Sequence, residues 1–431
     1  MKKILLISYF FHPDSGAVTT CIKNILTVLG KKIDIVVYTP TIRPKQSKRE
    51  ELFGITVKRL NNFWNLVRVY KNSIINKIQI SDKSHFVKRY LILLIRAVFL
   101  PVQIIGNYYG LLSEYAWNKR CYNGIIKNED MTSYHAIIAV AYPFSDIRIA
   151  HKLKKKYPKL KEILIEFDPY TYNPVFLTDD KIKKDKFNLR YNEENEWFKY
   201  ADNIIILQET YDLLRQTELF KWKDKLIPAA IPNLIFPDNK AEKLNRDNSE
   251  IHIVYAGIFY KDIRNPKFTF ELFNKICKKN RNVKLHIIGN GCEQHIDTAK
   301  SEMKENLIFY GKREKQFTMD IVSSADILLN ISNSIVSQLP SKIIEYLGMC
   351  KPIINIYSID DDICKKVLQK YPLSFSVRED FSKVDVLSDE VLEFVTSNFK
   401  NKCDAETIKQ NYYEYLPEAF TEKIITCLNT D

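Results

Sequence analysis

The sequence predicts an α/β protein made of two doubly wound, Rossmann-like domains. Its 431 residues are too many for one ordinary hydrophobic core and suit two domains of about 200 residues each. Short runs rich in Ile and Val alternate with longer helical patterns in both halves, which is the pattern of strand–helix–strand units in parallel sheets. Between the halves, Ile231–Glu250 holds two prolines, four asparagines and many charges, as linkers do.

These observations define four segments. We expect an N-terminal domain over residues 1–235, a linker over 236–250 and a second domain over 251–410. The remaining segment, 411–431, ends in a helix that can pack back on the first domain.

In the first half, the apolar runs are nearly continuous, so each strand should be covered on both faces. The expected strands lie at 3–10, 32–40, 135–142, 162–168 and 203–208, and the expected helices at 19–32, 145–158 and 191–201.

The second half repeats the pattern, and two such domains bind ligands at the carboxyl ends of their strands. The expected strands lie at 251–259, 283–291, 306–312, 325–332 and 351–357, and the expected helices at 266–280, 315–325, 340–350 and 415–431.

Composition excludes several classes of protein. With 45% hydrophobic and 27% charged residues and no low-complexity tract, the chain is neither fibrous nor disordered. Eight scattered cysteines without a C-x-x-C pair favour free thiols in a reducing compartment over disulfides or zinc. The apolar run that begins at Ile4 is short and interrupted by Ser8, which favours a first strand over a signal peptide. We therefore expect a cytoplasmic protein.

The positive charge is concentrated near the N-terminus. Residues 1–120 hold 20 Lys and Arg against 6 Asp and Glu, and the whole chain carries a net charge of +13. No nucleic-acid-binding signature accompanies this charge, so an anionic membrane surface is the favoured partner. Phe86–Gly110 mixes basic residues with large apolar ones, but Arg96 and Pro101 interrupt it below the ~20 apolar residues of a spanning helix. It is either a membrane-surface helix or an ordinary helix that covers the first core.

Several motifs are absent or weak. Gly289 and Gly291 form a G-x-G, but position 294 is Gln, so a dinucleotide fingerprint is incomplete. There is no P-loop, H-E-x-x-H or G-x-S-x-G motif. The triplet Asp360–Asp362 matches a D-x-D metal pattern, yet acidic residues at a helix start are common for other reasons. We expect neither a metal nor a cofactor.

The stretch "SQLPSKIIEYLGMCKPI", Ser337–Ile353, is the strongest functional signal. Pro340 suits the first turn of a helix, and Ser341 and Lys342 lie in that turn, where free N–H groups favour a phosphate. Glu345 follows one turn later on the same side and could accept hydrogen bonds from the two hydroxyls of a ribose. The alternative is an amphipathic helix with a surface Lys–Glu pair.

The stretch "PSKIIEYLGMCKPII" resembles the donor-site helix of GT-B glycosyltransferases of the family 4 type, as found in bacterial surface-polysaccharide assembly. Upstream, "IVYAGIF", "LHIIGNG", "LIFYGK" and "ADILLNIS" follow in the family's order. The resemblance implies two Rossmann-like domains facing a central cleft, the first for the acceptor and the second for the donor. It also implies a hexosyltransferase that moves a sugar from a nucleotide-diphosphate sugar, with retention and without a metal.

The resemblance also implies site residues. Glu345 matches the ribose-binding glutamate, and Ser341 and Lys342 fall beside the donor diphosphate. Lys342 and Arg264 would stabilise the charge on the departing diphosphate. The other implied donor contacts are Lys261, Gly16, Gly289, Tyr310 and Gly311. His12 and Asp168 follow strands of the first domain and could touch the acceptor or the sugar.

One position departs from the family's pattern. Many relatives have two glutamates in an E-x7-E arrangement, and the first of these positions holds Ser337 here. This departure leaves open a non-catalytic nucleotide-sugar-binding subunit. A sugar-nucleotide epimerase of GT-B fold, which would bind the same donor, is the second alternative. The expected partners are the donor, a glycan or lipid-linked acceptor, and an anionic membrane at its inner face.

Overall fold

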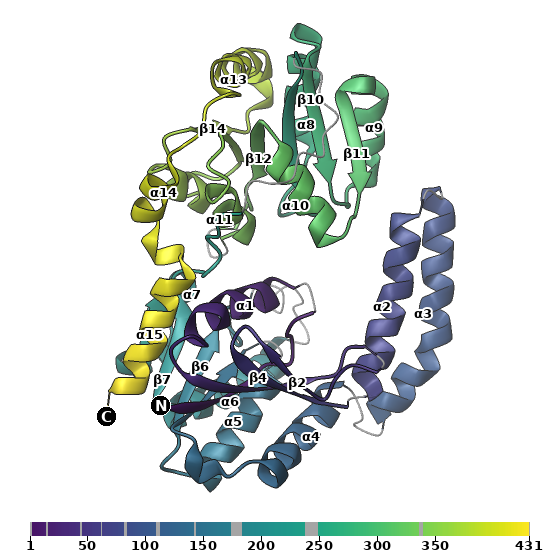
Figure 1. Ribbon diagram of the computed structural model, residues 1–431. Coiled ribbons are helices and arrows are strands. Elements are labelled where there is room, and N and C mark those ends of the chain that lie inside the picture. Colours follow the sequence, from purple (N-terminus) through teal and green to yellow (C-terminus); the bar gives the residue numbers. More distant parts are fainter. Residues whose placement is uncertain are drawn as a thin grey trace. The chain divides into compact units, whose positions relative to one another are not determined.

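The computed structural model describes residues 2–13, 16–43, 45–61, 63–81, 84–108, 113–141, 144–173, 183–237, 249–335 and 339–430. The chain separates into two compact units (Figure 1). Unit 1 comprises Met1–Pro232 and Glu414–Asp431, and unit 2 comprises Asn233–Tyr413.

Unit 1 contains an eight-stranded sheet in the order β3-β4-β2-β1-β5-β6-β7-β8. All neighbouring strands pair in parallel except β3 with β4, which are antiparallel. The strands are β1 (Lys3–Ile7), β2 (Asp34–Pro40), β3 (Arg49–Leu52), β4 (Ile55–Leu60), β5 (Ala136–Val140), β6 (Lys161–Glu166), β7 (Asn203–Leu207) and β8 (Leu226–Ala229). The five strands expected from apolar runs are all present, whereas β3, β4 and β8 were not expected.

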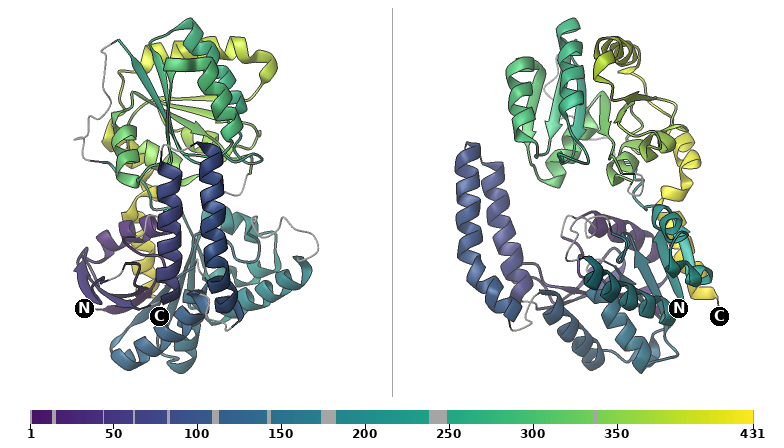
Figure 2. Two further views of the ribbon diagram at one scale, coloured as in Figure 1. Left: turned by 90° about the vertical axis from the view of Figure 1, so that its right-hand side faces the viewer. Right: turned by 180° about the vertical axis from the view of Figure 1, so that it is seen from behind.

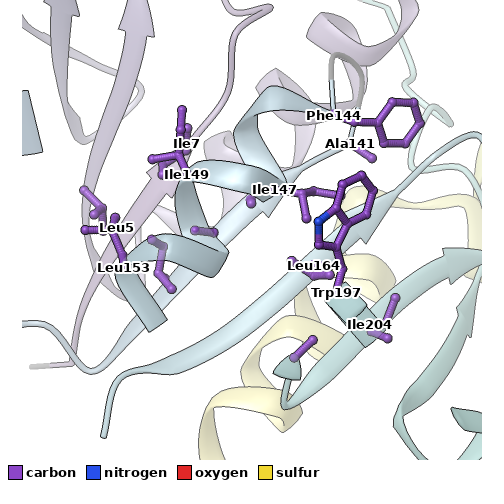
Figure 3. Packing of buried hydrophobic residues seen from close by; sticks show 14 of the residues in the cluster. Leu5, Ile7, Ala141, Phe144, Ile147, Ile149, Leu153, Leu164, Trp197 and Ile204 are labelled. Atoms are coloured by element: carbon purple, nitrogen blue, oxygen red, sulfur yellow. The ribbon is translucent and has the colours of Figure 1, made fainter. Parts of the chain in front are cut away.

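Helices cover both faces of this sheet. Leu5 and Ile7 of β1 point to one face, where α4, α5 and α6 contribute the core, and Figure 3 shows α5 side chains such as Leu153 beside them. Ile4 and Leu6 point to the other face, against α1 and the final helix α15. The helices are α1 (Ala17–Leu29), α2 (Phe63–Ile80), α3 (His85–Tyr108), α4 (Ser113–Asn128), α5 (Ser145–Lys156), α6 (Lys183–Tyr200), α7 (Gln208–Leu214) and α15 (Pro417–Asn429), with 3-10 turns η1 (Met131–Ser133) and η3 (Glu218–Lys225).

Helices α2 and α3 form a hairpin that extends away from the sheet of unit 1 (Figures 1 and 2). The main partner of α3 is α2, and α2 also contacts α4. α3 continues without a break through Arg96 and Pro101. The sequence left two expectations for this segment. The expectation of a helix that covers the first core is wrong, because α3 packs on α2 and leaves much of its apolar surface exposed.

Unit 2 contains a six-stranded parallel sheet in the order β11-β10-β9-β12-β13-β14. Its strands are β9 (Ile251–Ala256), β10 (Val283–Ile288), β11 (Leu307–Gly311), β12 (Ile327–Ile331), β13 (Ile353–Tyr357) and β14 (Ser374–Arg378). Its helices are α8 (Lys267–Lys279), α9 (Glu293–Met303), α10 (Lys315–Ser324), α11 (Ser341–Leu347), α12 (Ile363–Leu368), α13 (Val384–Asn398) and α14 (Ala405–Asn411), with 3-10 turns η4 (Lys304–Asn306), η5 (Phe381–Lys383) and η6 (Tyr413–Tyr415).

The units divide at Pro232, three residues before the expected boundary. The physical reason is that Asn233 hydrogen-bonds to Glu345, and Ile235 lies against Gly348, so both belong to unit 2. Most of the expected linker, residues 238–248, lies outside the described residues. The final helix belongs to unit 1, where α15 packs on α1.

Candidate functional site

The candidate donor site lies at the point where the strand order of unit 2 reverses, which is called the switch point of the sheet. From β9 the chain adds β10 and β11 on one side, and then returns to place β12 on the other side of β9. Crossover connections leave β9 and β12 in opposite directions, so the carboxyl edge between these two strands is the usual ligand position of a doubly wound sheet. The loop after β9 meets residues 333 and 334, which follow β12, at this edge.

Arg264 ties these two segments together. Its Nη2 and Nε donate to Oδ1 of Asn333, at 2.7 and 3.1 Å, and Asn333 follows β12. The backbone groups of Arg264 and Tyr260 exchange two hydrogen bonds that close the loop after β9. Arg264 is half-buried, whereas Lys261, at the tip of the same loop, is exposed.

α11 begins at Ser341, and Pro340 is its N-cap residue rather than part of the first turn. The helix buries Ile343, Ile344, Tyr346 and Leu347 against unit 2 and leaves Ser341, Lys342 and Glu345 half-buried on one side. The sequence-based expectation that these three residues share a side is confirmed by this burial pattern.

Lys342 and Glu345 contact each other. Lys342 Nζ donates to Glu345 Oε2 at 2.6 Å, and Asn233 Nδ2 donates to Glu345 Oε1 at 3.1 Å. Each carboxylate oxygen therefore has a partner inside unit 2. The Lys–Glu pair that the sequence left as an alternative is present, and it lies beside the switch point rather than on a remote surface.

A buried tyrosine holds α11 against the end of β9. The hydroxyl of Tyr346 accepts a hydrogen bond of 3.0 Å from the backbone N–H of Ala256, the last residue of β9. Burial raises the pKa of this hydroxyl, which stays protonated. The bond fixes the position of Glu345, the preceding residue, relative to the loop after β9.

Gly289 and Gly311 join the loops after β9, β10 and β11. A Cβ on Gly289 would lie 1.7 Å from the carbonyl oxygen of Gly257, so no larger residue fits there. Gly311 has φ +68°, and its carbonyl accepts from the N–H of Gly289 at 3.0 Å. The close approach at Gly289, which the sequence assigned to the donor, is thus to the loop after β9 in unit 2.

Tyr310 is the extra residue of a β-bulge in the edge strand β11, because the register shifts from Ile287–Phe309 to Ile288–Gly311. The extra residue of a bulge has backbone groups left out of the ladder. The Tyr310 side chain points elsewhere: its hydroxyl lies 3.0 Å from Nδ1 of His286, and its ring stacks on that imidazole.

In unit 1 the strand order reverses between β1 and β5, and the loop after β1 carries His12 and Gly16. Gly16 is the exposed N-cap residue of α1, with φ −80°. Among the described residues, a Cβ there would meet only Thr19 Oγ1 at 3.7 Å, an ordinary contact. Unit 1 itself therefore does not require glycine at this position.

His12 is held through its backbone. The carbonyl of His12 accepts a 2.7 Å hydrogen bond from Arg59, a fully buried guanidinium that also pairs with Glu50 at 2.6 Å. Burial, with Lys23 and Arg59 nearby, lowers the pKa of the His12 imidazole. His12 is therefore neutral at pH 7. No sequence pattern pointed to Arg59, because a lone arginine normally faces solvent.

Asp168 follows β6, and burial raises the pKa of its carboxyl. Sequence reasoning missed two buried carboxyls in this part of unit 1, Glu166 at the end of β6 and Glu194 on α6. Burial raises both pKa values, that of Glu194 to about 6. Glu194 accepts hydrogen bonds from the N–H groups of Tyr170 and Thr171 and so fixes the loop after Asp168.

The acidic triplet has ordinary structural partners. Asp362 is the N-cap of α12 and accepts from the N–H of Lys365 at 2.6 Å, while Asp360 pairs with Arg378. Among the residues that the structure describes, no group of three His, Cys, Asp or Glu side chains is placed to hold a metal ion. Ser337, at the first position of E-x7-E, lies outside the described residues.

Two Rossmann-like units, each built on a sheet that is parallel apart from the β3–β4 pair, define a class of fold, and solved structures share it. TarM is 12% identical with a TM-score of 0.60, and the alignment covers 100% of this chain and 99% of that one. "Trehalose-6-phosphate from E. coli bound with UDP-2-fluoro glucose" is 10% identical with a TM-score of 0.59 and full coverage of both chains. WaaG, "a glycosyltransferase involved in lipopolysaccharide biosynthesis", is 12% identical with a TM-score of 0.52, covering 98% and 99%. The fold is GT-B, as the resemblance implies.

A sequence-family comparison narrows the class. The family model described as "Glycosyl transferases group 1" matches residues 250–364, which include Arg264, Lys342 and Glu345. A search of curated proteins by sequence found no match. The family match and the GT-B fold together support a glycosyltransferase.

Proposed function

We propose that this protein is a hexosyltransferase of the family 4 type that moves a sugar from a nucleotide-diphosphate sugar to an acceptor hydroxyl, with retention of configuration and without a metal. One observation carries the proposal. Arg264 and the Lys342–Glu345 pair gather at the switch point of unit 2, within the segment that matches the glycosyltransferase family.

Glu345 is the proposed ribose ligand. Its Oε1 is oriented by the buried amide of Asn233, whereas Oε2 is bonded to Lys342, which is partly exposed. A diphosphate beside Ser341 would draw Lys342 away from Glu345, because two phosphate charges attract the ammonium more strongly than one carboxylate. Glu345 Oε2 would then be available to the ribose hydroxyls.

The basic residues are the proposed catalytic contributors. In the transfer step, the bond from the anomeric carbon to the diphosphate oxygen breaks and a bond to the acceptor oxygen forms. The acceptor proton passes to the departing diphosphate. Lys342 and Arg264, with Lys261 and the Ser341 hydroxyl, would stabilise the negative charge that develops on that diphosphate.

The remaining donor and acceptor contacts follow from position. Backbone groups at Tyr310 and Gly311 would meet the base, since the bulge removes Tyr310 from the ladder. Gly16 would allow the backbone to approach the sugar or diphosphate, and this proposal is supported by a glycine that unit 1 itself does not require. His12 and Asp168 remain proposed contacts to acceptor or sugar.

The proposed acceptor is a polysaccharide glycan or a lipid-linked glycan, and the proposed location is the cytoplasm, with peripheral contact to the inner face of the cell membrane. The basic N-terminal region supports an anionic membrane partner. A neighbour with the same fold is described as acting in lipopolysaccharide biosynthesis. Among the helices that the structure describes, none combines the length and the apolar composition needed to cross a bilayer.

The first experiment is a thermal-shift screen of nucleoside diphosphates, followed by hydrolysis assays with the matching sugar nucleotides. A nucleotide at 100 times its Kd should stabilise the protein by about 2.7 kcal/mol. Glu345→Ala should reduce this stabilisation, and Lys342→Ala and Arg264→Ala should lower turnover about tenfold or more. Lys278→Ala, an exposed lysine on α8, is the control and should change neither quantity.

The outcomes separate the open alternatives. Slow release of free sugar and nucleoside diphosphate supports the transferase. Interconversion of sugar nucleotides would instead identify an epimerase, and binding without turnover a non-catalytic subunit. Wild-type behaviour of all three site variants would remove the site assignment.

A further inference from the structure

The hairpin helix α3 exposes an apolar stripe along most of its length. Among the described side chains of α3, eight large apolar ones are exposed, from 39% at Val87 to 79% at Phe86. They are Phe86, Val87, Tyr90, Leu93, Leu94, Val98, Leu100 and Ile104. At 100° per residue these positions occupy one continuous side of the helix. Monomeric proteins rarely leave such a stripe uncovered unless it binds something.

The opposite side of α3 already has a partner. Leu91, Ile92 and Ile95 are half-buried, and Lys88 donates to the carbonyl of Gln79 on α2 at 3.2 Å. α3 therefore has two apolar sides, one against α2 and one exposed. Packing within unit 1 explains only the first.

Positive charge borders the exposed stripe. Arg89 and Arg96 are exposed, and each stands four residues before a stripe residue, Leu93 and Leu100. α2 and α3 together hold six basic residues and no Asp or Glu in their sequences: Arg68, Lys71, Lys77, Lys88, Arg89 and Arg96.

We infer that the exposed stripe of α3 inserts into the surface of an anionic lipid bilayer, with the helix lying in the plane of the interface. An interfacial helix needs an apolar face bordered by Lys or Arg, and α3 has both. Its 24 residues span about 36 Å. The inference rests on the proposed function, which names an anionic membrane as a partner. It adds that α3 is the helix that contacts the membrane.

A second copy of the chain fits this stripe less well than lipid does. Helices that pair through an apolar seam usually carry opposite charges along its borders. Here neither border of a paired seam would carry an acidic side chain, since α2 and α3 have no Asp or Glu in their sequences. Like charges would therefore oppose association of two hairpins, whereas anionic headgroups would attract each of them.

The test uses the full-length protein and sedimentation with vesicles of phosphatidylcholine alone or with 30% phosphatidylglycerol. Wild-type protein should bind the anionic vesicles, and more strongly at low salt. Leu93→Glu with Val98→Glu should lower the affinity at least tenfold, because two charges would enter the apolar boundary. Each of Arg89→Ser and Arg96→Ser should lower it about fivefold.

Matched controls come from unit 2. Val386→Glu replaces an equally exposed apolar residue on α13, and Lys278→Ser an exposed cation on α8, so both should bind vesicles as wild type does. All α3 substitutions are at exposed positions, so the unfolding temperature should not change. Hydrolysis of the sugar nucleotide without vesicles should also match wild type in every α3 variant.

Three results would overturn the inference: no vesicle binding by wild type at low salt, equal binding by Leu93→Glu with Val98→Glu, or a wild-type dimer that this double substitution converts to a monomer without any lipid effect. The proposed function can fail separately. Vesicle binding through α3 with no sugar-nucleotide turnover would leave the inference standing and remove the transferase.

Discussion

At the scale of single residues, Glu345 has a partner for each carboxylate oxygen before any donor arrives. The spacing of Lys342 and Glu345 predicts that they share a side of one helix, and the structure confirms it. It could not predict Asn233, whose amide reaches Oε1 from 112 positions away. Arg264 is similar, because its partner Asn333 is 69 positions distant. Long-range hydrogen bonds of this kind leave no periodic trace in a sequence.

A second residue-scale feature is the row Tyr310–His286–His252, in which both histidines are buried and Tyr310 is half-buried. His286 Nε2 lies 2.9 Å from Nδ1 of His252, and burial, with His252 and Lys284 nearby, lowers the pKa of His286 to about 3. His286 is therefore neutral in the folded unit but can be protonated below pH 6.5 once unfolded.

This row predicts a pH dependence of stability. Because the unfolded state binds the extra proton, the contribution of His286 is full above pH 6.5 and is lost progressively as the pH falls below it. From pH 7.5 to 5.5, the free energy of unfolding of unit 2 should fall by about 1.4 kcal/mol from this residue. Urea unfolding at the two pH values measures it. His286→Gln should have a lower free energy of unfolding than wild type at pH 7.5. Between pH 7.5 and 5.5, its free energy of unfolding should fall by about 1.4 kcal/mol less than that of wild type. If both proteins lost the same amount, the assignment to His286 would be contradicted.

At the scale of elements, the loops after β9, β10 and β11 act as one layer. Gly289 lies against Gly257, and Gly289 N–H bonds to Gly311. The apolar runs predicted the strands, but only the sheet order brings these three loops to one edge. β3 and β14 were missed because their sequences, "REEL" and "SFSVR", lack the apolar run of a doubly covered strand, and β3 is an edge strand.

A pair of glycine substitutions separates packing from ligand approach. Gly289→Ala should destabilise unit 2 by about 1–3 kcal/mol, because its Cβ would overlap a backbone oxygen that has no room to move. Gly16→Ala should cost only about 0.5–1 kcal/mol, the ordinary difference between Gly and Ala at a helix N-cap, since among the described residues its Cβ meets nothing closer than 3.7 Å.

Denaturant unfolding and sugar-nucleotide turnover, measured together, check both substitutions. Gly16→Ala should fold normally and turn over more slowly if the backbone approaches the donor there. Normal turnover would remove Gly16 from the site, and a stable Gly289→Ala protein would show that the loop contact is not tight.

At the scale of the whole molecule, the chain has separate cores. Those of unit 1 lie on the two faces of its sheet, and the core of unit 2 lies around β9, β10 and β12. The last helix returns to unit 1, where Phe420 and Ile424 of α15 are buried beside Phe167 and α1. The sequence pattern of this segment predicted a helix. The burial of the apolar face of α15 against unit 1 decides that α15 stabilises unit 1.

Calorimetry should therefore resolve two effects. Phe420→Ala removes a fully buried aromatic side chain and should destabilise unit 1 by about 3–5 kcal/mol, while leaving the transition of unit 2 in place. A bound nucleoside diphosphate should raise the transition of unit 2. Val386→Ala, at an exposed position, is the control and should shift neither. If Phe420→Ala lowered only the transition of unit 2, the assignment of α15 would be wrong.

The sequence by itself determined the α/β class, ten strands of the two sheets, the final helix and the polar side of α11, because each depends on local apolar periodicity. It also carried the resemblance that names a GT-B glycosyltransferase. Only the tertiary structure decided that Lys342 pairs with Glu345, that Asn233 and Asn333 orient Glu345 and Arg264, and that α3 keeps an exposed apolar side. These features depend on which distant segments of the chain come into contact. Strand order and burial determine those contacts, and local sequence periodicity does not.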